Sequence, residues 1–268
     1  MILLKYPEFK KGRILKKEML EELRDYPREM FEIYFSDYSD GIIVGFEIKV
    51  KDEELIISPG ILKINKGILY LKKEEKISYE KTNKEMQIKL VLEEKTEDKD
   101  YGYLNGEVVI EELKEKSKNK DEIKERDENK NEIELGRYKL REGALLRDSY
   151  ENLMDYSVEY NMLNIINVKY STISGNSLKK EILDKFGDVL VRKGEQSIDI
   201  SFGMNILNGK EVSRKAINVY LERKLKKKID ELENIDIYNH LLKISKNIGK
   251  EERVEKTGRR RATRIIVE

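Results

Sequence analysis

Few side chains of this 268-residue chain have the types and spacing that catalysis needs. The sequence has one histidine, His240, and no cysteine, so a histidine metal cluster, a Ser-His-Asp triad and a Cys-His pair all lack partners. Residues 203–211 have five residues between two glycines where a phosphate-binding loop has four, and Glu211 stands where that loop has a serine or threonine. Asp199 is flanked by isoleucines, and we expect it to be a helix-start or interface residue. We therefore expect no catalytic residue, cofactor, metal ion or small-molecule substrate, and a surface or packing role for His240.

The C-terminal region is basic. Residues 209–268 contain 17 Lys and Arg against 10 Asp and Glu, a net charge of 17 − 10 = +7, with dense runs at 223–228 and 259–261. Three interpretations are open: a charged helix face with a solvated tail, a contact with an acidic protein surface, or a contact with nucleic acid. No recognised nucleic-acid-binding fold surrounds the patch, which argues against nucleic acid.

The end of the chain combines this basic cluster with β-branched residues, a composition that suits an added strand on an open sheet edge. We expect it to dock on a neighbouring subunit or on the β-rich half of the same chain. The predicted partner-binding residues are Arg259, Arg260, Arg261, Arg264, Ile265, Ile266 and Val267.

The overall composition sets broad limits. Charged residues make up 40% of the chain and hydrophobic residues 38%, with a net charge of +1, so the total charge favours neither nucleic acid nor membrane. The absence of cysteine fits folding in a reducing cytoplasm. The apolar start is too short for a signal peptide, and no run approaches the roughly 20 apolar residues of a membrane span. We expect a soluble cytoplasmic protein without a membrane segment.

The chain is predicted to be organised around a β scaffold at residues 40–71. Apolar and charged residues alternate from Phe46 to Lys51, as in a half-buried strand. Gly45 interrupts the run, which indicates a bulge or a close backbone approach. Residues 58–60 and 65–67 have the composition of tight turns.

Two helices are predicted before this scaffold, at residues 16–25 and 28–35, with Pro27 in the first turn of the second. The nearby aromatic side chains predict core packing of helix on sheet. They are Tyr26, Phe31, Tyr34, Phe35 and Tyr38.

The predicted fold class is α+β. Residues 1–145 form a β-rich domain of small antiparallel sheets or a barrel with two leading helices, and residues 146–268 form a mainly helical domain with a basic C-terminal arm. Within the first domain, residues 111–134 contain 17 charged residues of both signs in 24 positions, which indicates a solvated hairpin tip or a linker. In the second, Asp148 or Ser149 is predicted to cap a helical turn and Ser177 to cap a helix.

Several stretches together resemble phage tail and baseplate-associated proteins of clostridial contractile-tail prophages and R-type, diffocin-like bacteriocins. The resemblance covers most of residues 10–195. Its motifs are short: a helix leading into Asp40-Gly41-Ile42-Ile43-Val44-Gly45-Phe46, the hairpins at 57–61 and 66–70, residues 138–147, residues 159–164 and the helix from Ser177.

The resemblance implies a non-enzymatic structural component of a baseplate or tail-fibre attachment complex. The implied partners are other baseplate or tail proteins and copies of the chain itself. Such a protein is cytoplasmic during assembly and then part of a released tail-like particle. An enzyme of unrecognised class and a nucleic-acid-binding module are the alternatives.

Overall fold

The computed structural model describes residues 5–65, 67–93, 96–113, 131–209, 211–229 and 232–249. Its fold is α+β, with most strands before residue 140, two more at residues 170–177 and a helical group after residue 179. The described helices are α1 (Lys17–Tyr34), α3 (Lys180–Lys193), α4 (Ser197–Leu207), α5 (Arg214–Leu225), α6 (Asn234–Asn247) and the short 3₁₀ helix η1 (Asp155–Ser157).

The strands form four small sheets. The largest has the order β13-β12-β1-β4-β5, and the others are β10-β7-β11, β2-β3-β6 and the β8-β9 hairpin. The strands are β1 (Gly41–Gly45), β2 (Ile48–Lys51), β3 (Glu54–Ile57), β4 (Gly60–Ile64), β5 (Gly67–Leu71), β6 (Glu75–Ser78), β7 (Glu85–Leu92), β8 (Thr96–Glu97), β9 (Gly102–Tyr103), β10 (Gly106–Glu112), β11 (Glu132–Lys139), β12 (Tyr170–Thr172) and β13 (Gly175–Ser177).

The predicted scaffold around Gly45 is confirmed, with one correction. The expected close approach is present, because a Cβ on Gly45 would lie 2.1 Å from the carbonyl oxygen of Pro59 and its φ is +77°. However, the run from Gly41 to Lys51 is two strands rather than one. Phe46 is buried with a φ of +55°, and this bend takes the chain from the sheet of β1 into the sheet of β2.

The two leading helices are a single helix, α1, which continues through Pro27. Proline at this position removes the hydrogen bond to the carbonyl of Leu23 and ordinarily ends or kinks a helix. No residue of α1 is buried, so water can hydrate that carbonyl. The predicted break at Pro27 is therefore wrong.

Two predicted caps are also wrong. Ser177 ends β13, and its hydroxyl donates a hydrogen bond to the carbonyl of Val212 (3.0 Å), while α3 begins at Lys180 without a side-chain cap. For the other prediction, a cap by Asp148 or Ser149, the turn η1 has no side-chain cap. Asp148 instead accepts a hydrogen bond from the backbone N–H of Val50 (2.9 Å). Both side chains join segments far apart in sequence.

The β-rich and helical parts share one core. Parallel pairing of Ile42 with Tyr170 adds β12 and β13 to the sheet of β1, and buried side chains from Ile42 to Ile244 form a single cluster. The division at residue 145 stays a prediction about how the two parts behave alone. Most of residues 111–134 lies outside the described residues.

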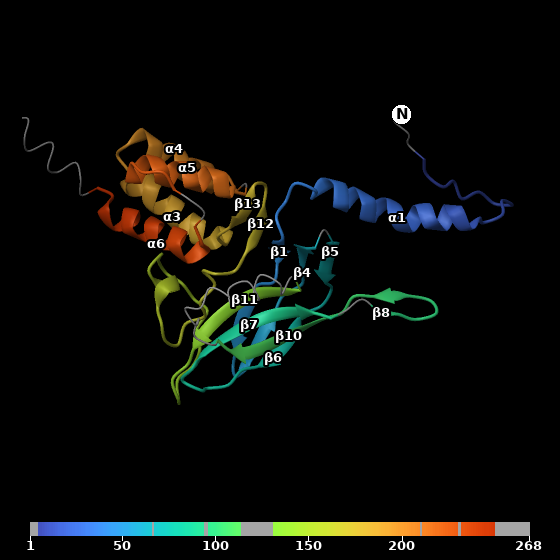
Figure 1. Ribbon diagram of the computed structural model, residues 1–268, viewed down its shortest axis with the longest axis horizontal. Coiled ribbons are helices and arrows are strands. Elements are labelled where there is room, and N and C mark those ends of the chain that lie inside the picture. Colours follow the sequence, from blue (N-terminus) through green and yellow to red (C-terminus); the bar gives the residue numbers. More distant parts are fainter. Residues whose placement is uncertain are drawn as a thin grey trace, which may run out of the picture.

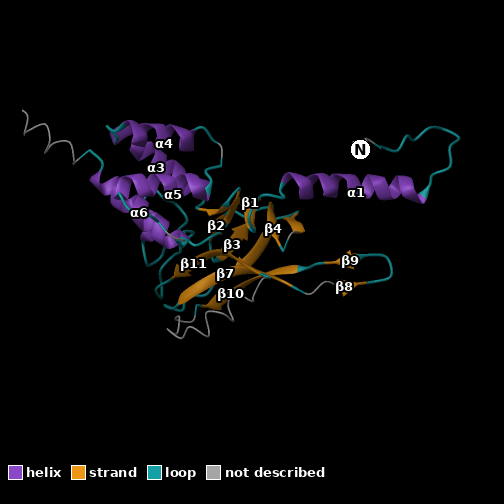
Figure 2. Cartoon of the chain, turned by 45° about the horizontal axis from the view of Figure 1, so that its top comes forward, coloured by secondary structure: helices purple, strands orange, loops and turns teal. Residues whose placement is uncertain are grey.

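The helices α3, α4, α5 and α6 lie together at one end of the molecule, whereas α1 and the β8-β9 hairpin project from the opposite end (Figures 1 and 2). No described helix is both long and apolar enough to cross a bilayer.

Candidate assembly surface

The predicted arm, Arg259 to Val267, lies outside the described residues, so its role stays a prediction. The described surface most suited to binding a protein partner is instead at the other terminus, on α1. The sequence predicts amphipathic helices here, but their aromatic side chains were expected to lie in the core.

The base of α1 is fixed by a buried lysine that sequence reasoning missed. Lys63, in β4, is 8% exposed, and its ammonium donates hydrogen bonds to the backbone carbonyls of Phe35 (2.6 Å), Ser36 (3.0 Å) and Tyr38 (2.6 Å). The carbonyls at a helix C-terminus carry partial negative charge, which the ammonium neutralises. The available signal was a lysine within the otherwise apolar strand Ile61–Ile64.

Aromatic rings add a second contact at this base. Phe35 stacks with Phe31 at 6.3 Å between centroids and meets the edges of Tyr34 (4.9 Å) and Tyr38 (5.0 Å). This cluster is at the surface rather than in the core, because Phe31 is 51% exposed and Tyr34 is 71% exposed. The predicted core packing is therefore wrong for Tyr26, Phe31 and Tyr34, whereas Phe35 and Tyr38 are half-buried.

The rest of α1 leaves its apolar face in solvent. Its contact with a strand is near its C-terminal end, with β5. The exposed large apolar side chains of residues 5–34 are Tyr6, Phe9, Ile14, Leu15, Leu20, Leu23, Tyr26, Met30, Phe31, Ile33 and Tyr34. Contiguous apolar surface of this kind marks an interaction site in a soluble protein.

The polar side of α1 faces the β8-β9 hairpin. Arg24, Asp25, Arg28 and Glu29 line a cavity of about 620 Å³ together with residues 97–102 of the hairpin. Both projections extend the same way from the sheets (Figure 1). The apolar face of α1 therefore points away from the hairpin.

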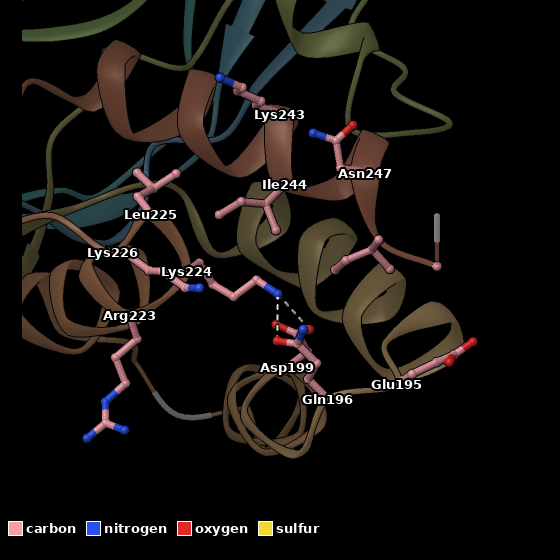
Figure 3. A pocket seen from close by; sticks show the side chains of 12 residues that line it. Glu195, Gln196, Asp199, Arg223, Lys224, Leu225, Lys226, Lys243, Ile244 and Asn247 are labelled. Atoms are coloured by element: carbon pink, nitrogen blue, oxygen red, sulfur yellow. Dashed lines mark hydrogen bonds and ion pairs between the residues drawn. The ribbon is translucent and has the colours of Figure 1, made fainter. Parts of the chain in front are cut away.

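A second open surface is a basic pocket of about 480 Å³ between the start of α4 and the ends of α5 and α6 (Figure 3). At its base, Lys224 pairs with the buried Asp199 at 3.0 Å, and the hydroxyl of Tyr220 donates to the same carboxylate at 2.8 Å. Burial raises the pKa of Tyr220, so this hydroxyl stays protonated and donates. The structure thus confirms Asp199 as a helix-start residue, here inside a buried network.

The basic side chains that line this pocket point in different directions. The ammonium of Lys224 points inward to Asp199, whereas the Arg223 side chain extends away from that pair (Figure 3). Lys226 and Lys243 also line the pocket. The basic run 223–228 is therefore divided between an internal ion pair and residues that can meet a ligand.

A half-buried charged cluster joins the β-rich part to α3. Lys179 pairs with Glu47 and lies 3.3 Å from Glu181, and Tyr156 donates to Glu181 at 2.9 Å. Burial raises the pKa of Tyr156 and of the neighbouring Tyr150, which keeps both neutral. Because two carboxylates neutralise the lysine, the cluster positions α3 against β1 and β2 rather than supplying a free base.

The sequence features that suggested chemistry have structural roles. Gly203 lies in α4, where a Cβ would meet Leu190 at 2.9 Å, so this glycine permits close packing of α4 on α3 and not phosphate binding. His240 is half-buried on α6. Among the described residues, no group of histidine and carboxylate side chains could hold a metal ion.

Comparisons with known proteins give one structural likeness. No protein-family model and no curated protein matches the chain. A solved structure, "Crystal structure of TssK", is similar over 90% of this chain and 70% of the TssK chain, at 8% sequence identity and a TM-score of 0.35. A TM-score this low transfers neither a fold family nor a role to this chain.

Proposed function

We propose that this chain is a non-enzymatic structural component of a contractile tail-like particle, in the baseplate or tail-fibre attachment region. It acts by binding other particle proteins. It is made in the cytoplasm of the producing cell and leaves with a phage-tail-like particle of the bacteriocin or prophage type.

The observation that carries the proposal is α1, an 18-residue helix with no buried residue and a continuous apolar face. Helices in proteins gain most of their stability from packing an amphipathic face against other parts of the structure, and α1 lacks that packing. Lys63 nevertheless holds the base of α1 in a fixed place. A helix that is anchored at one end and uncovered along its face is suited to receive a partner.

The resemblance to tail and baseplate proteins supports a role in a contractile tail-like particle. The residues that carry it here build the scaffold: Gly45 permits the approach of Pro59, and the turns at 58–60 and 65–67 connect β3, β4 and β5. The residues that this chain shares with tail and baseplate proteins build its scaffold, and none of them belongs to a recognised catalytic motif. Such a pattern fits an assembly protein better than an enzyme. The likeness to the TssK structure, at a TM-score of 0.35, adds no weight to the proposal.

Deletion and complementation in the producing cell test this function. Cells without the gene should release no complete particles, and an epitope-tagged full-length chain should restore them and carry the label at one end of the tail in electron micrographs. Complete particles in its absence, or purified particles without the label, would refute the proposal.

A further inference from the structure

The charged residues of α1 form two rows of opposite sign beside its apolar face. Successive residues of an α-helix are about 100° apart around its axis, and on this basis the apolar residues from Met19 to Tyr34 occupy an arc of about 160°. Lys17, Arg24 and Arg28 follow one edge of this arc, and Glu18, Glu22 and Glu29 follow the other. The helix therefore has a basic edge and an acidic edge.

This arrangement is complementary to itself in only one orientation. When identical helices pack in parallel around a common axis, the basic edge of each faces the acidic edge of its neighbour. When two such helices pack antiparallel, each edge faces its own copy and like charges meet. Edge charges of this kind set partner choice and orientation in helical bundles.

The edge residues of α1 already make contacts within the chain, at the surface of the molecule. Four ion pairs engage them: Lys5 with Glu22 (2.6 Å), Arg24 with Asp25 (2.7 Å), Lys17 with Glu21 (3.2 Å) and Arg28 with Glu32 (3.1 Å). All four are at the surface, where ion pairs contribute little to stability, so the charges of a neighbouring copy can replace them. The β8-β9 hairpin shares a cavity with Arg24, Arg28 and Glu29 of the edges, but no apolar side chain of α1 lines that cavity. Neighbouring copies can thus approach the arc without meeting the hairpin.

A membrane is a poorer partner for the same face. Helices that lie on membranes carry mostly lysine and arginine on their polar side. The polar side of α1 has six acidic and three basic residues. A groove of unrelated sequence would need its own matched charge rows, whereas a second copy of α1 already has them.

We propose that α1 mediates parallel self-association of this chain, with the apolar arcs in contact and the edge of Lys17, Arg24 and Arg28 paired with the acidic edge of the next copy. The inference rests on the proposed function only in taking α1 as an assembly surface. Its partner is another copy of the same chain.

Light scattering of the full-length protein across a concentration series tests the association. The mass should rise from 31.7 kDa to a multiple of it. The double variant Leu23→Glu/Met30→Glu should stay monomeric with an unchanged circular dichroism spectrum, since neither side chain is buried. Leu145→Glu, at a comparably exposed apolar residue outside α1, should associate as the unmodified chain does.

Charge reversal tests the pairing of the edges. One variant carries Lys17→Glu, Arg24→Glu and Arg28→Glu, and the other carries Glu18→Lys, Glu22→Lys and Glu29→Lys. Each alone should lose association at least tenfold, and an equimolar mixture should recover it. Association of either variant alone at the unmodified level would overturn the proposed pairing.

Crosslinking tests the orientation, because the chain contains no cysteine of its own. Oxidised Leu20→Cys protein should form a covalent dimer, and so should Tyr34→Cys protein, whereas a mixture of the two should give no mixed product above random exchange. A mixed product without the two homodimers would show antiparallel packing and refute the inference.

A chain that remains at 31.7 kDa at every concentration also refutes self-association. That result leaves the proposed function standing if particles still carry the labelled chain, because a different particle protein then covers α1. If the chain self-associates but purified particles lack the label, the proposed function is refuted and the self-association stands.

Discussion

Helices α1 and α3 have similar amphipathic sequences and opposite environments. In α3, Ile182 and Phe186 are completely buried against α4 and α6. In α1, Leu20 is 48% exposed and Leu23 is 55% exposed. Apolar periodicity indicates that a face is to be buried, but it does not tell whether the covering surface belongs to the same chain.

This difference separates stability from assembly. The sheets and α3 to α6 share one core, which holds the chain together by itself. The apolar face of α1 contributes little to that core, so changes there should affect binding without unfolding the protein. The predictions below test this separation, from the largest expected loss of stability to the smallest.

Removing the Phe186 ring should cost the most. This side chain is fully buried and meets Tyr220 edge-on at 5.9 Å. Phe186→Ala should lower the free energy of unfolding by about 3–5 kcal/mol, whereas Leu23→Ala in α1 should change it by less than about 0.5 kcal/mol. Urea denaturation in dilute solution measures both. Equal losses at the two sites would contradict the separation of α1 from the core.

Breaking the ion pair in the basic pocket should have the next largest effect. Asp199→Ala removes the partner of Lys224, which is only 13% exposed, together with the acceptor for Tyr220. Loss of one member of a buried pair costs about 3–5 kcal/mol, and the lower end is expected because the pocket admits water. Arg223→Met, at the neighbouring residue that extends away from this pair, is the matched control and should leave denaturation unchanged.

Replacing Lys63 should loosen α1 and the segment at its base without affecting the helical group of α3 to α6. Lys63→Met removes three charge-assisted hydrogen bonds, each of which contributes about 1.5–3 kcal/mol in favourable cases. Part of that loss is recovered when water reaches the freed carbonyls, so we expect about 2 kcal/mol. Amide exchange should accelerate in α1 and residues 36–40 but not in α3. The exposed Lys49→Met in β2 serves as the control, and unchanged exchange at residues 36–40 would show that Lys63 is no anchor.

The features that sequence could predict depend on neighbours along the chain. Alternation identified the strands around Phe46, glycine and proline located the turns, and spacing located α3 and α4. The close approach at Gly45 was also predictable, because a glycine inside a strand often marks a bulge or a place where another backbone comes close.

The features that sequence missed depend on distant partners. Lys63 in an apolar strand gains its role from carbonyls that precede it by about 25 residues, and Ser177 finds an acceptor at Val212 rather than at its own helix. Parallel pairing of β1 with β12 likewise joins Ile42 and Tyr170 across more than a hundred residues. No local pattern contains these contacts. The apolar face of α1 was predictable as a face, but its exposure was not.

The C-terminal arm should have the smallest effect on stability and a large effect on assembly. Its run Ile265-Ile266-Val267 has the composition of a strand, and chain ends are ordered only when something holds them. Pairing with a sheet edge would supply backbone hydrogen bonds, while Arg259, Arg260 and Arg261 set register against acidic groups. Deleting residues 257–268 should change the free energy of unfolding by less than about 0.5 kcal/mol, because the described core is built from residues between Ile42 and Ile244. The same deletion should reduce the yield of complete particles in the complementation assay. If truncated chains assemble active particles at the normal yield, the arm is a solvated tail, and α1 is then the surface on which assembly depends.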